Sequence, residues 1–462
     1  MRAMHDELIF DWNEAALRGP IFPRPFELHD ETLRDGIQNP SGVDPGIGDK
    51  LEILHLLDEV GVESTDVGLP GAGPRAFEDV LTLCKEIAKH KLGIRATCAG
   101  RTLEADIAPM VEVSQKSGIP VEVMTFIGSS PIRQYAEGWT DEKIIDLSVK
   151  AIRFAVKEGL PVTFVTEDTT RSKPAFLTDL FRAAIDAGAT RLCLCDTVGH
   201  VTPDGVINLL QFTKHVIAGT GADVKIDWHG HNDRGLALVN SLYALEHGAD
   251  RVHGCVLGIG ERVGNAPLDL LLINLKLLGA LADRDLSKLA ALCRKVSAAT
   301  RFPIPIAYPV VGEDAFRTAT GVHAAAIIKA QKKGDEWLAD RVYSGVPAAM
   351  FGREQEICIG PMSGISNVTY WLESRGIEAR GTLIKAILVV AKASDHNLST
   401  EEVLAVVDRH KKTEAKEAAE KAAEKAAAKD VSKDGAKSEP DEAKDTKDEP
   451  VVTKANGKPI EV

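Results

Sequence analysis

The chain has 462 residues, of which 44% are hydrophobic and 27% charged, and its formal net charge is −13. These proportions are typical of a folded globular protein, and the negative charge argues against nucleic acid or an anionic membrane surface as a partner. The opening residues MRAMHDELIF do not resemble a secretory signal, and the sequence has no apolar stretch of about 18 residues that would span a membrane. We therefore expect a cytoplasmic protein.

Seven cysteines are scattered along the chain, at positions 84, 98, 193, 195, 255, 293 and 358. Cys193 and Cys195 have one residue between them, which is not the two-residue spacing of a zinc knuckle or a redox pair. We expect the thiols to be free and buried in a reducing compartment.

Short apolar runs alternate with longer amphipathic ones from residue 25 to residue 280, after an N-terminal extension over 1–24. Eight candidate strands are FELHDET (26–32), ESTDVGL (63–69), GIRATC (93–98), VEVMTFI (121–127), VTFVTE (162–167), RLCLCD (191–196), VKIDWHGH (224–231) and DRVHGCV (250–256). Eight strands alternating with helices predict an α/β fold, a (β/α)8 TIM barrel. An open, doubly wound sheet is the alternative, but polar residues at nearly every strand end favour the barrel.

The rest of the chain divides into two further parts. Residues 281–410 are predicted to form a mostly helical subdomain. Residues 411–462 contain no aromatic residue and are dominated by Ala, Lys, Glu and Asp. The segment TEAKEAAEKAAEKAAAK is compatible with a transient helix, with pairs such as Glu417–Lys421, but it has no apolar stripe to bury. We expect a disordered charged tail.

The first strand runs into HDETLRDGIQNP (29–40), which places Asp30, Glu31, Arg34 and Asp35 at the end of a buried strand. Buried charges need partners or a chemical role. The pattern therefore indicates either a network of charges that closes the barrel mouth or part of a functional site.

The seventh strand ends in WHGHND (228–233), where His229 and His231 are two residues apart and so point to the same side of a strand. Two imidazoles beside a carboxylate suit a divalent metal with open positions. Asp35 would lie nearby in a closed barrel, which favours a metal site over two histidines without ligand function. A 2-oxo acid could chelate this metal, which would polarise its ketone.

The eighth strand is followed by GIGERVGNAPLD (258–269), in which Gly258, Gly260 and Gly264 would let the backbone approach a ligand closely. Barrels often hold phosphate after strand eight. A tight turn without a ligand is the alternative reading of these glycines.

Four segments together carry a family resemblance: HDETLRDGIQ, DTVGHVTP (196–203), HGHNDRGLALVNSLYALEHGADRV (229–252) and GIGERVGN. They resemble the metal-dependent acyltransferase branch of the superfamily that contains 2-isopropylmalate, homocitrate and citramalate synthases, over about residues 25 to 370. The resemblance implies a TIM barrel in which Asp35, His229 and His231 bind Mg, Mn or Zn.

The resemblance also implies roles for individual residues. Arg34 would stabilise negative charge on the ketone oxygen, with Glu167, Thr197 and Gln38 contacting the oxo acid. The loop with Gly258, Gly260, Glu261, Gly264 and Asn265 would contact the acyl-CoA, Asn265 lying near the metal. TGVHAAAIIKA (320–330) would supply a catalytic histidine, His323, and YSGVPAAMFGR its partner, Tyr343. In this family the subdomain reaches over a neighbouring barrel, which implies a homodimer with shared active sites.

The implied reaction joins acetyl-CoA to a 2-oxo acid with release of CoA. A 2-isopropylmalate synthase, acting in leucine biosynthesis, is our first expectation. Homocitrate or citramalate synthase is the alternative, because Arg133 in TFIGSSPIRQY resembles homocitrate synthases and could bind a second carboxylate. Thr163 and GLPGAG (68–73) depart from the homocitrate synthase pattern.

Two other readings are weaker. A hydroxymethylglutaryl-CoA lyase would be expected to carry a cysteine in the loop that here reads GIGERVGN. A non-catalytic scaffold would not need Arg34, Asp35, His229, His231, His323 and Tyr343 together. The tail in place of a folded regulatory domain also argues against feedback inhibition through such a domain.

Overall fold

The computed structural model describes residues 8–13 and 21–434. Much of the predicted N-terminal extension (1–24) and the end of the predicted tail (435–462) therefore lie outside the described residues. The described residues divide into two compact units, one formed by those up to residue 318 with 322–357 and the other by residues 319–321 with 358–434. In the described ranges, no helix combines the length and apolar character needed to cross a membrane.

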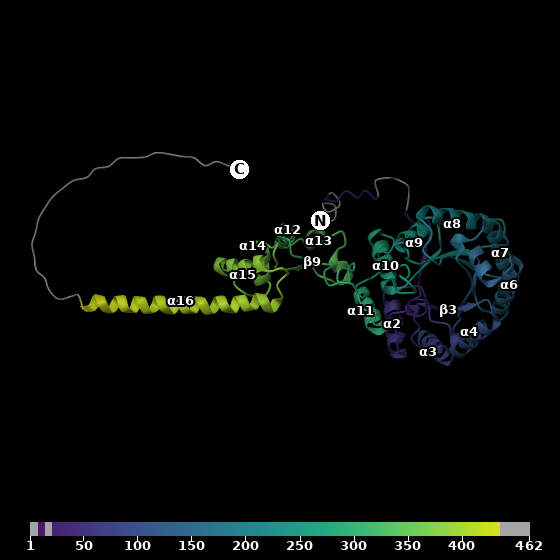
Figure 1. The fold of residues 1–462 in the computed structure, drawn as a ribbon, viewed down its shortest axis with the longest axis horizontal. Coiled ribbons are helices and arrows are strands. Elements are labelled where there is room, and N and C mark those ends of the chain that lie inside the picture. Colours follow the sequence, from purple (N-terminus) through teal and green to yellow (C-terminus); the bar gives the residue numbers. More distant parts are fainter. Residues whose placement is uncertain (1–7, 14–20, 435–462) are drawn as a thin grey trace, which may run out of the picture. The chain divides into compact units, whose positions relative to one another are not determined.

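Eight parallel strands close into a barrel in the order β1 to β8, with β8 pairing back onto β1 (Figure 1). The strands are β1 (Glu27–Asp30), β2 (Ser64–Asp66), β3 (Arg95–Arg101), β4 (Glu122–Gly128), β5 (Val162–Glu167), β6 (Arg191–Asp196), β7 (Lys225–Gly230) and β8 (Arg251–Gly254). Each overlaps one of the eight strands predicted from the sequence. The barrel prediction is therefore confirmed, and the open sheet is excluded.

Helices follow the strands and surround them, as Figure 1 shows for α3, α4, α6, α7 and α8. They are α2 (Ile47–Glu59), α3 (Pro74–His90), α4 (Glu104–Ser117), α5 (Pro131–Glu137), α6 (Asp141–Lys157), α7 (Pro174–Asp186), α8 (Pro203–Ala218), α9 (Ala237–Glu246) and α10 (Leu268–Leu277). α6 shows why they form here: Thr140 caps its first turn by accepting from Lys143 N–H, and Ile144, Ala151 and Ile152 are buried on one face.

The predicted boundary at residue 280 does not coincide with the end of the first compact unit, which extends to residue 357. The reason is apolar packing: Leu292, Val296, Val310, Phe316 and Phe351 belong to the same buried cluster as the barrel and its helices. Burial of each such side chain contributes roughly 1.5–3 kcal/mol. This part contains α11 (Leu289–Thr300), β9 (Arg317–Thr318), most of α12 (Gly321–Lys332), α13 (Glu336–Arg341) and β10 (Glu356–Ile357).

The second unit contains α14 (Ile365–Glu373), α15 (Gly381–Ala393) and α16 (Thr400–Asp434). Its own core is built around Trp371, Leu372, Ile387 and Val403. α16 continues through residues 411–434, the first part of the segment that was expected to be a disordered tail. Alanine has a high helix propensity, and Glu and Lys pairs add to it, so this segment forms a helix without an apolar stripe.

Candidate active site and metal centre

Three neighbouring strands bring the predicted metal ligands together. β8 pairs with both β7 and β1, so the ends of β7 and β1 lie on either side of β8. Asp35 follows β1 and precedes a 3-10 turn at Gly36–Gln38, whereas His229 lies in β7 and His231 just after it. Barrel closure therefore brings Asp35 close to both histidines.

The donor atoms of these residues face one another. Asp35 Oδ2 lies 3.6 Å from His231 Nε2 and 4.0 Å from His229 Nε2. Two donors on one ion with bonds of about 2.1 Å stand roughly 3–3.5 Å apart, so the observed separations need little adjustment. Asp35 Oδ2 is buried and has no hydrogen-bond partner in the described structure. A carboxylate oxygen left without a donor beside two imidazoles fits a cation.

The electrostatics of the three groups are set by burial and by their neighbours. Burial opposes ionisation of Asp35, but the charges of Arg34, His229 and His231 together outweigh it and keep the pKa of this carboxyl below its usual range. For His229, burial is opposed by the charge and hydrogen bond of Glu31, which raise the pKa to about 9. Burial and the nearby His229 lower the pKa of His231 to about 4. A metal would compete with the proton on His229.

The Arg34 guanidinium is fixed by three carboxylates. Its Nε donates to Asp66 Oδ2 at 2.7 Å, its Nη1 to Asp35 Oδ1 at 2.8 Å and its Nη2 to Glu31 Oε1 at 2.8 Å. These partners raise its pKa even though burial opposes the charge. Arg34 remains charged and holds one orientation beside the candidate metal ligands. The sequence left two interpretations of these charges open, a charge network and a functional site. In the structure Glu31, Arg34 and Asp35 both form the network and line the candidate site.

A pocket of about 260 Å³ opens over these residues. The predicted site residues that line it are Arg34, Asp35, Gln38, Glu167, Thr197, His229, His231 and Glu261. Besides Glu31, the rest of its lining is largely apolar and consists of Leu69, Ala99, Met124, Phe126, Val165, Cys193 and Cys195. The lining of the pocket thus combines charged and metal-ligating groups with hydrocarbon side chains.

Arg133 does not line this pocket. It lies in α5, where its Nη1 donates to Glu137 Oε1 at 3.1 Å and its Nη2 is 3.8 Å from Glu167 Oε2. Its Nε is buried without a hydrogen-bond partner. The charge of Arg133 is therefore directed to two carboxylates of this chain.

The loop after β8 is folded tightly, and most of it lies behind the pocket wall. Glu261 reaches the pocket, whereas Gly258, Gly260, Gly264 and Asn265 do not line it. Gly264 has φ +95°, and a Cβ there would lie only 1.8 Å from the carbonyl oxygen of Gly258. The Asn265 amide donates to the carbonyl of Ile259 at 3.1 Å, and residue 265 forms a bridge with His231. Asn265 therefore supports the metal-ligand segment from outside the pocket.

His323 and Tyr343 lie together in the second half of the first unit. Their rings are stacked, with centroids 4.0 Å apart and an interplanar angle of 27°. Tyr343 is 48% exposed, and neither residue lines the pocket. The fold thus brings these two residues together but does not place them among the barrel residues of this pocket.

Comparison with known proteins agrees with this architecture. The family model described as HMGL-like matches residues 25–296. The chain belongs to this family. Homocitrate synthase AksA of Methanopyrus kandleri is 33% identical over 380 residues, which cover 82% of this chain and 90% of the relative. The 2-isopropylmalate synthase of Sulfolobus acidocaldarius is 32% identical over 368 residues, with coverage of 79% and 90%.

Another relative in this HMGL-like group is (R)-citramalate synthase CimA of Methanocaldococcus jannaschii, which is 33% identical over 353 residues covering 76% of this chain and 67% of the relative. The hydroxymethylglutaryl-CoA lyase of Bacillus subtilis has a similar fold, with a TM-score of 0.52 at 20% identity, covering 62% of this chain and 97% of that one. The relatives are condensing enzymes, and this HMGL-like chain is an acyl-transferring enzyme of the same type. The three synthases are named for different products, which are homocitrate, 2-isopropylmalate and citramalate.

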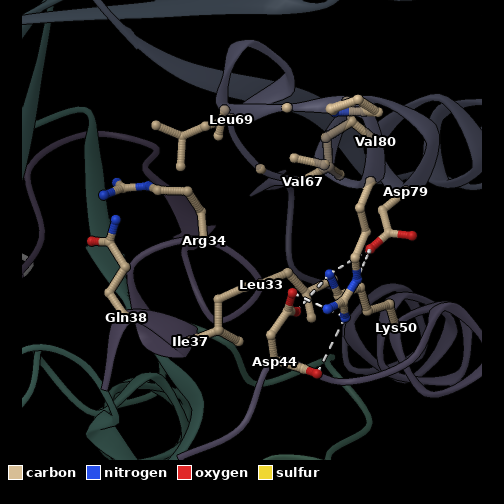
Figure 2. A pocket seen from close by; sticks show the side chains of 16 residues that line it. Leu33, Arg34, Ile37, Gln38, Asp44, Lys50, Val67, Leu69, Asp79 and Val80 are labelled. Atoms are coloured by element: carbon tan, nitrogen blue, oxygen red, sulfur yellow. Dashed lines mark hydrogen bonds and ion pairs between the residues drawn. The ribbon is translucent and has the colours of Figure 1, made fainter. Parts of the chain in front are cut away.

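A second pocket of about 490 Å³ adjoins the first in this HMGL-like barrel. Arg34, Gln38 and Leu69 line both pockets. Figure 2 shows Arg34 and Gln38 on one side of the second pocket and the ion pairs of Lys50 with Asp44 and Asp79 on another. The two cavities therefore share a wall made of candidate substrate-binding residues.

Several residues that support the site were not predicted from the sequence, chiefly Asp66, Asp227, Arg251 and His253. All are completely or almost completely buried. A signal was present, because a charged residue inside a strand of a parallel barrel needs a partner within the core. What the sequence alone lacked was the identity of those partners, which lie on strands far apart in the chain.

Proposed function

We propose that this protein condenses acetyl-CoA with a 2-oxo acid that has an apolar side chain, as expected of a 2-isopropylmalate synthase. The observation that carries this proposal is the mixed lining of the pocket. Asp35, His229 and His231 line it together with apolar side chains such as Met124 and Val165. A 2-oxo acid of this class has matching ends, an oxygen-rich one and a hydrocarbon one.

Asp35, His229 and His231 would hold a divalent Mg, Mn or Zn ion. The ion would act as a Lewis acid and polarise the ketone of the oxo acid. Carboxylate and imidazole donors are compatible with each of these metals. The orphaned Asp35 Oδ2 supports a cation at this position.

Residues of the chain would complete the recognition of the oxo acid. Arg34 is held by three carboxylates, so it can donate to the ketone oxygen as negative charge develops there without first changing its orientation. Thr197 and Gln38 line the pocket and would contact the bound acid. Burial raises the pKa of Glu167, which also lines the pocket.

The acyl-CoA would approach from the side of the second pocket, because the wall shared by the two pockets contains Arg34 and Gln38. The loop that carries Glu261 would border the acyl group. A base at His323, with Tyr343 as its partner, would remove a proton from the acetyl methyl group. We propose that these two residues act across the interface of a homodimer, because they do not line the pocket of their own barrel.

The atoms of the reaction then balance. The methyl carbon, having lost its proton to the base, forms a bond to the ketone carbon, and the ketone oxygen takes up a proton. Water hydrolyses the thioester, which releases CoA as a thiol and leaves a second carboxylate on the product. Loss of the thioester makes condensation favourable over cleavage.

The arrangement of Arg133 favours an apolar oxo acid over a dicarboxylic one. A second substrate carboxylate would need a free cation at the far end of the pocket, but Arg133 is already opposite Glu137 and Glu167. This favours the 2-isopropylmalate reaction over the homocitrate reaction.

The test is release of thiol from acetyl-CoA with a panel of 2-oxoisovalerate, 2-oxoglutarate, pyruvate and oxaloacetate, each with and without a chelator. We expect the highest kcat/KM with 2-oxoisovalerate and loss of activity with the chelator. The proposal fails if no oxo acid stimulates metal-dependent release. A preference for 2-oxoglutarate would support the homocitrate alternative. Cleavage of hydroxymethylglutaryl-CoA in a parallel assay would indicate a lyase.

A further inference from the structure

Glu31 connects two groups of the candidate site that the proposed reaction uses separately. Its Oε2 lies 2.7 Å from Nδ1 of His229, and its Oε1 accepts from Nη2 of Arg34 at 2.8 Å. The Glu31 side chain is 2% exposed, so water does not compete for these contacts. A carboxylate at Nδ1 requires that nitrogen to carry a proton, so Nε2, which faces Asp35, is the nitrogen available to bind a metal.

The carboxylate of Glu31 is itself held in place by a chain of contacts with buried residues of the barrel core. His253 Nδ1 lies 3.2 Å from Glu31 Oε1, and His253 Nε2 lies 3.3 Å from Asp227 Oδ2. Asp227 in turn accepts from Arg251 Nε at 2.8 Å. All of these residues are buried. A ring with carboxylates at both nitrogens donates from both, so His253 fixes the position of Glu31 relative to the barrel core.

His29, Glu31 and His253 also stand close enough to hold a second metal ion. Two contacts argue against that use. Both nitrogens of His253 already face carboxylates, and both oxygens of Glu31 already have donors. We therefore treat Glu31 as a support for the first metal site and not as a ligand of another.

We infer that Glu31 is a positioning residue that fixes the tautomer and the ring orientation of His229 for metal binding. His253 contacts Glu31 and holds its carboxylate in place relative to the barrel core. This inference rests on the proposed function, because it assumes that His229 binds the metal. It adds a pocket-lining residue that would act through His229 and not as a ligand of the ion. Partners of this kind typically contribute 10–100-fold to metal affinity.

The chain offers a matched control in Asp66. Asp66 and Glu31 are both buried, and both accept from Arg34, but only Glu31 contacts His229. Glu31→Gln and Asp66→Asn therefore each remove one carboxylate charge beside Arg34. Only the first alters the partner of the metal ligand.

The experiment titrates the full-length, metal-free protein and its variants with Co²⁺, which reports both affinity and ligand geometry through its visible absorption. We expect Glu31→Gln to raise the Kd about 10–100-fold and to change the absorption bands, and Asp66→Asn to stay within about threefold of the unsubstituted protein. Thermal unfolding of each metal-free variant checks that the barrel is intact. If Glu31→Gln does not fold, Glu31→Asp serves instead, because it keeps the charge but withdraws it from His229.

His229→Ala separates failure of the inference from failure of the proposed function. If His229→Ala binds Co²⁺ as tightly as the unsubstituted protein, the metal site itself is wrong. If His229→Ala loses Co²⁺ but Glu31→Gln and Asp66→Asn behave alike, only the role of Glu31 is wrong. Two Co²⁺ ions per chain, falling to one in Glu31→Gln, would overturn the inference by making Glu31 a ligand.

Discussion

The imidazole of His323 stacks on the phenol ring of Tyr343, with centroids 4.0 Å apart, although neither residue lines the barrel pocket. In the proposed mechanism this pair supplies the base. His323→Ala should lower kcat by about 10²–10⁴-fold, the usual contribution of a general base. Stopped-time assays of thiol release measure the change. Tyr343→Phe is the control that keeps the stack and removes only the hydroxyl. A kcat for His323→Ala within a few-fold of the unsubstituted enzyme would remove His323 from the mechanism.

Arg251 offers a test of the buried ion pairs in the barrel. It is 0% exposed and pairs with Asp227 and Glu122. Arg251→Met leaves both carboxylates buried without their main cation, which should lower the free energy of unfolding by about 3–5 kcal/mol in urea titrations. Arg101→Met, which removes an exposed pair with Asp106, should unfold close to the unsubstituted protein. Equal effects of the two substitutions would contradict this account.

Asp30 should make stability depend on pH. Burial raises its pKa from 3.8 to about 7, against the hydrogen bonds from Thr32 and Thr65. The folded protein therefore binds a proton that the unfolded chain has lost between about pH 4 and 7, so this group destabilises the fold as the pH rises. Relative to Asp30→Asn, the wild-type chain should lose up to about 1.4 kcal/mol per pH unit across this range. Denaturant titrations at several pH values measure it.

The control for that measurement is Asp106→Asn. The hydrogen bond from Arg101 lowers the pKa of Asp106, so its contribution is lost only as the pH falls below the unfolded value near 4. Between pH 5 and 8 the difference between Asp106→Asn and the wild-type chain should stay constant. A flat difference for Asp30→Asn as well would show that Asp30 titrates normally.

The apolar wall should set the size of the oxo acid. Ala99 lies in β3, is 2% exposed and lines the pocket. Ala99→Leu would fill space there, so kcat/KM should fall about tenfold more for 2-oxoisovalerate than for pyruvate, which has only a methyl group. Competition between the two acids in one reaction gives this ratio directly. An unchanged ratio would mean that the side chain of the oxo acid lies elsewhere.

The thiols should be protected in the folded state. All seven cysteines are buried, and burial raises the pKa of each one for which a shift is resolved, such as Cys84, where it reaches about 12. Fewer than one thiol per chain should react promptly with an aromatic disulfide reagent in buffer, and seven should react in denaturant. Prompt reaction of Cys193 or Cys195, which line the pocket, would show that the site opens in solution.

The barrel could be predicted from the sequence because its signal is local. Several strands are short apolar runs that end in polar residues, as in VTFVTE, where the predicted and observed strands both span Val162–Glu167. The convergence of Asp35 with His229 and His231 was also predictable, since ring closure makes strands one and seven near neighbours. These inferences require only periodicity and topology.

Other features depended on information that local patterns do not contain. The orientation of Arg133 toward Glu137 and Glu167 is set by how α5 sits on the end of β4, which spacing does not determine. The extent of the first unit to residue 357 depends on Phe316 and Phe351 packing with the barrel helices. The helix over 411–434 depends on the helix propensity of Ala, Glu and Lys and lacks the apolar stripe by which most helices are recognised in a sequence.

The ionic interior of the barrel has a consequence for its behaviour on heating. Charges on β4, β6, β7 and β8 meet there through Glu122, Arg191, Asp227 and Arg251, and Arg191 also pairs with the partly exposed Glu27 of β1. The cost of removing charged groups from water decreases as temperature rises, whereas the hydrophobic contribution per unit area levels off. The stabilisation that this interior provides should therefore fall less with rising temperature than that of an aliphatic interior. On heating, the barrel should unfold last among the described parts of the chain.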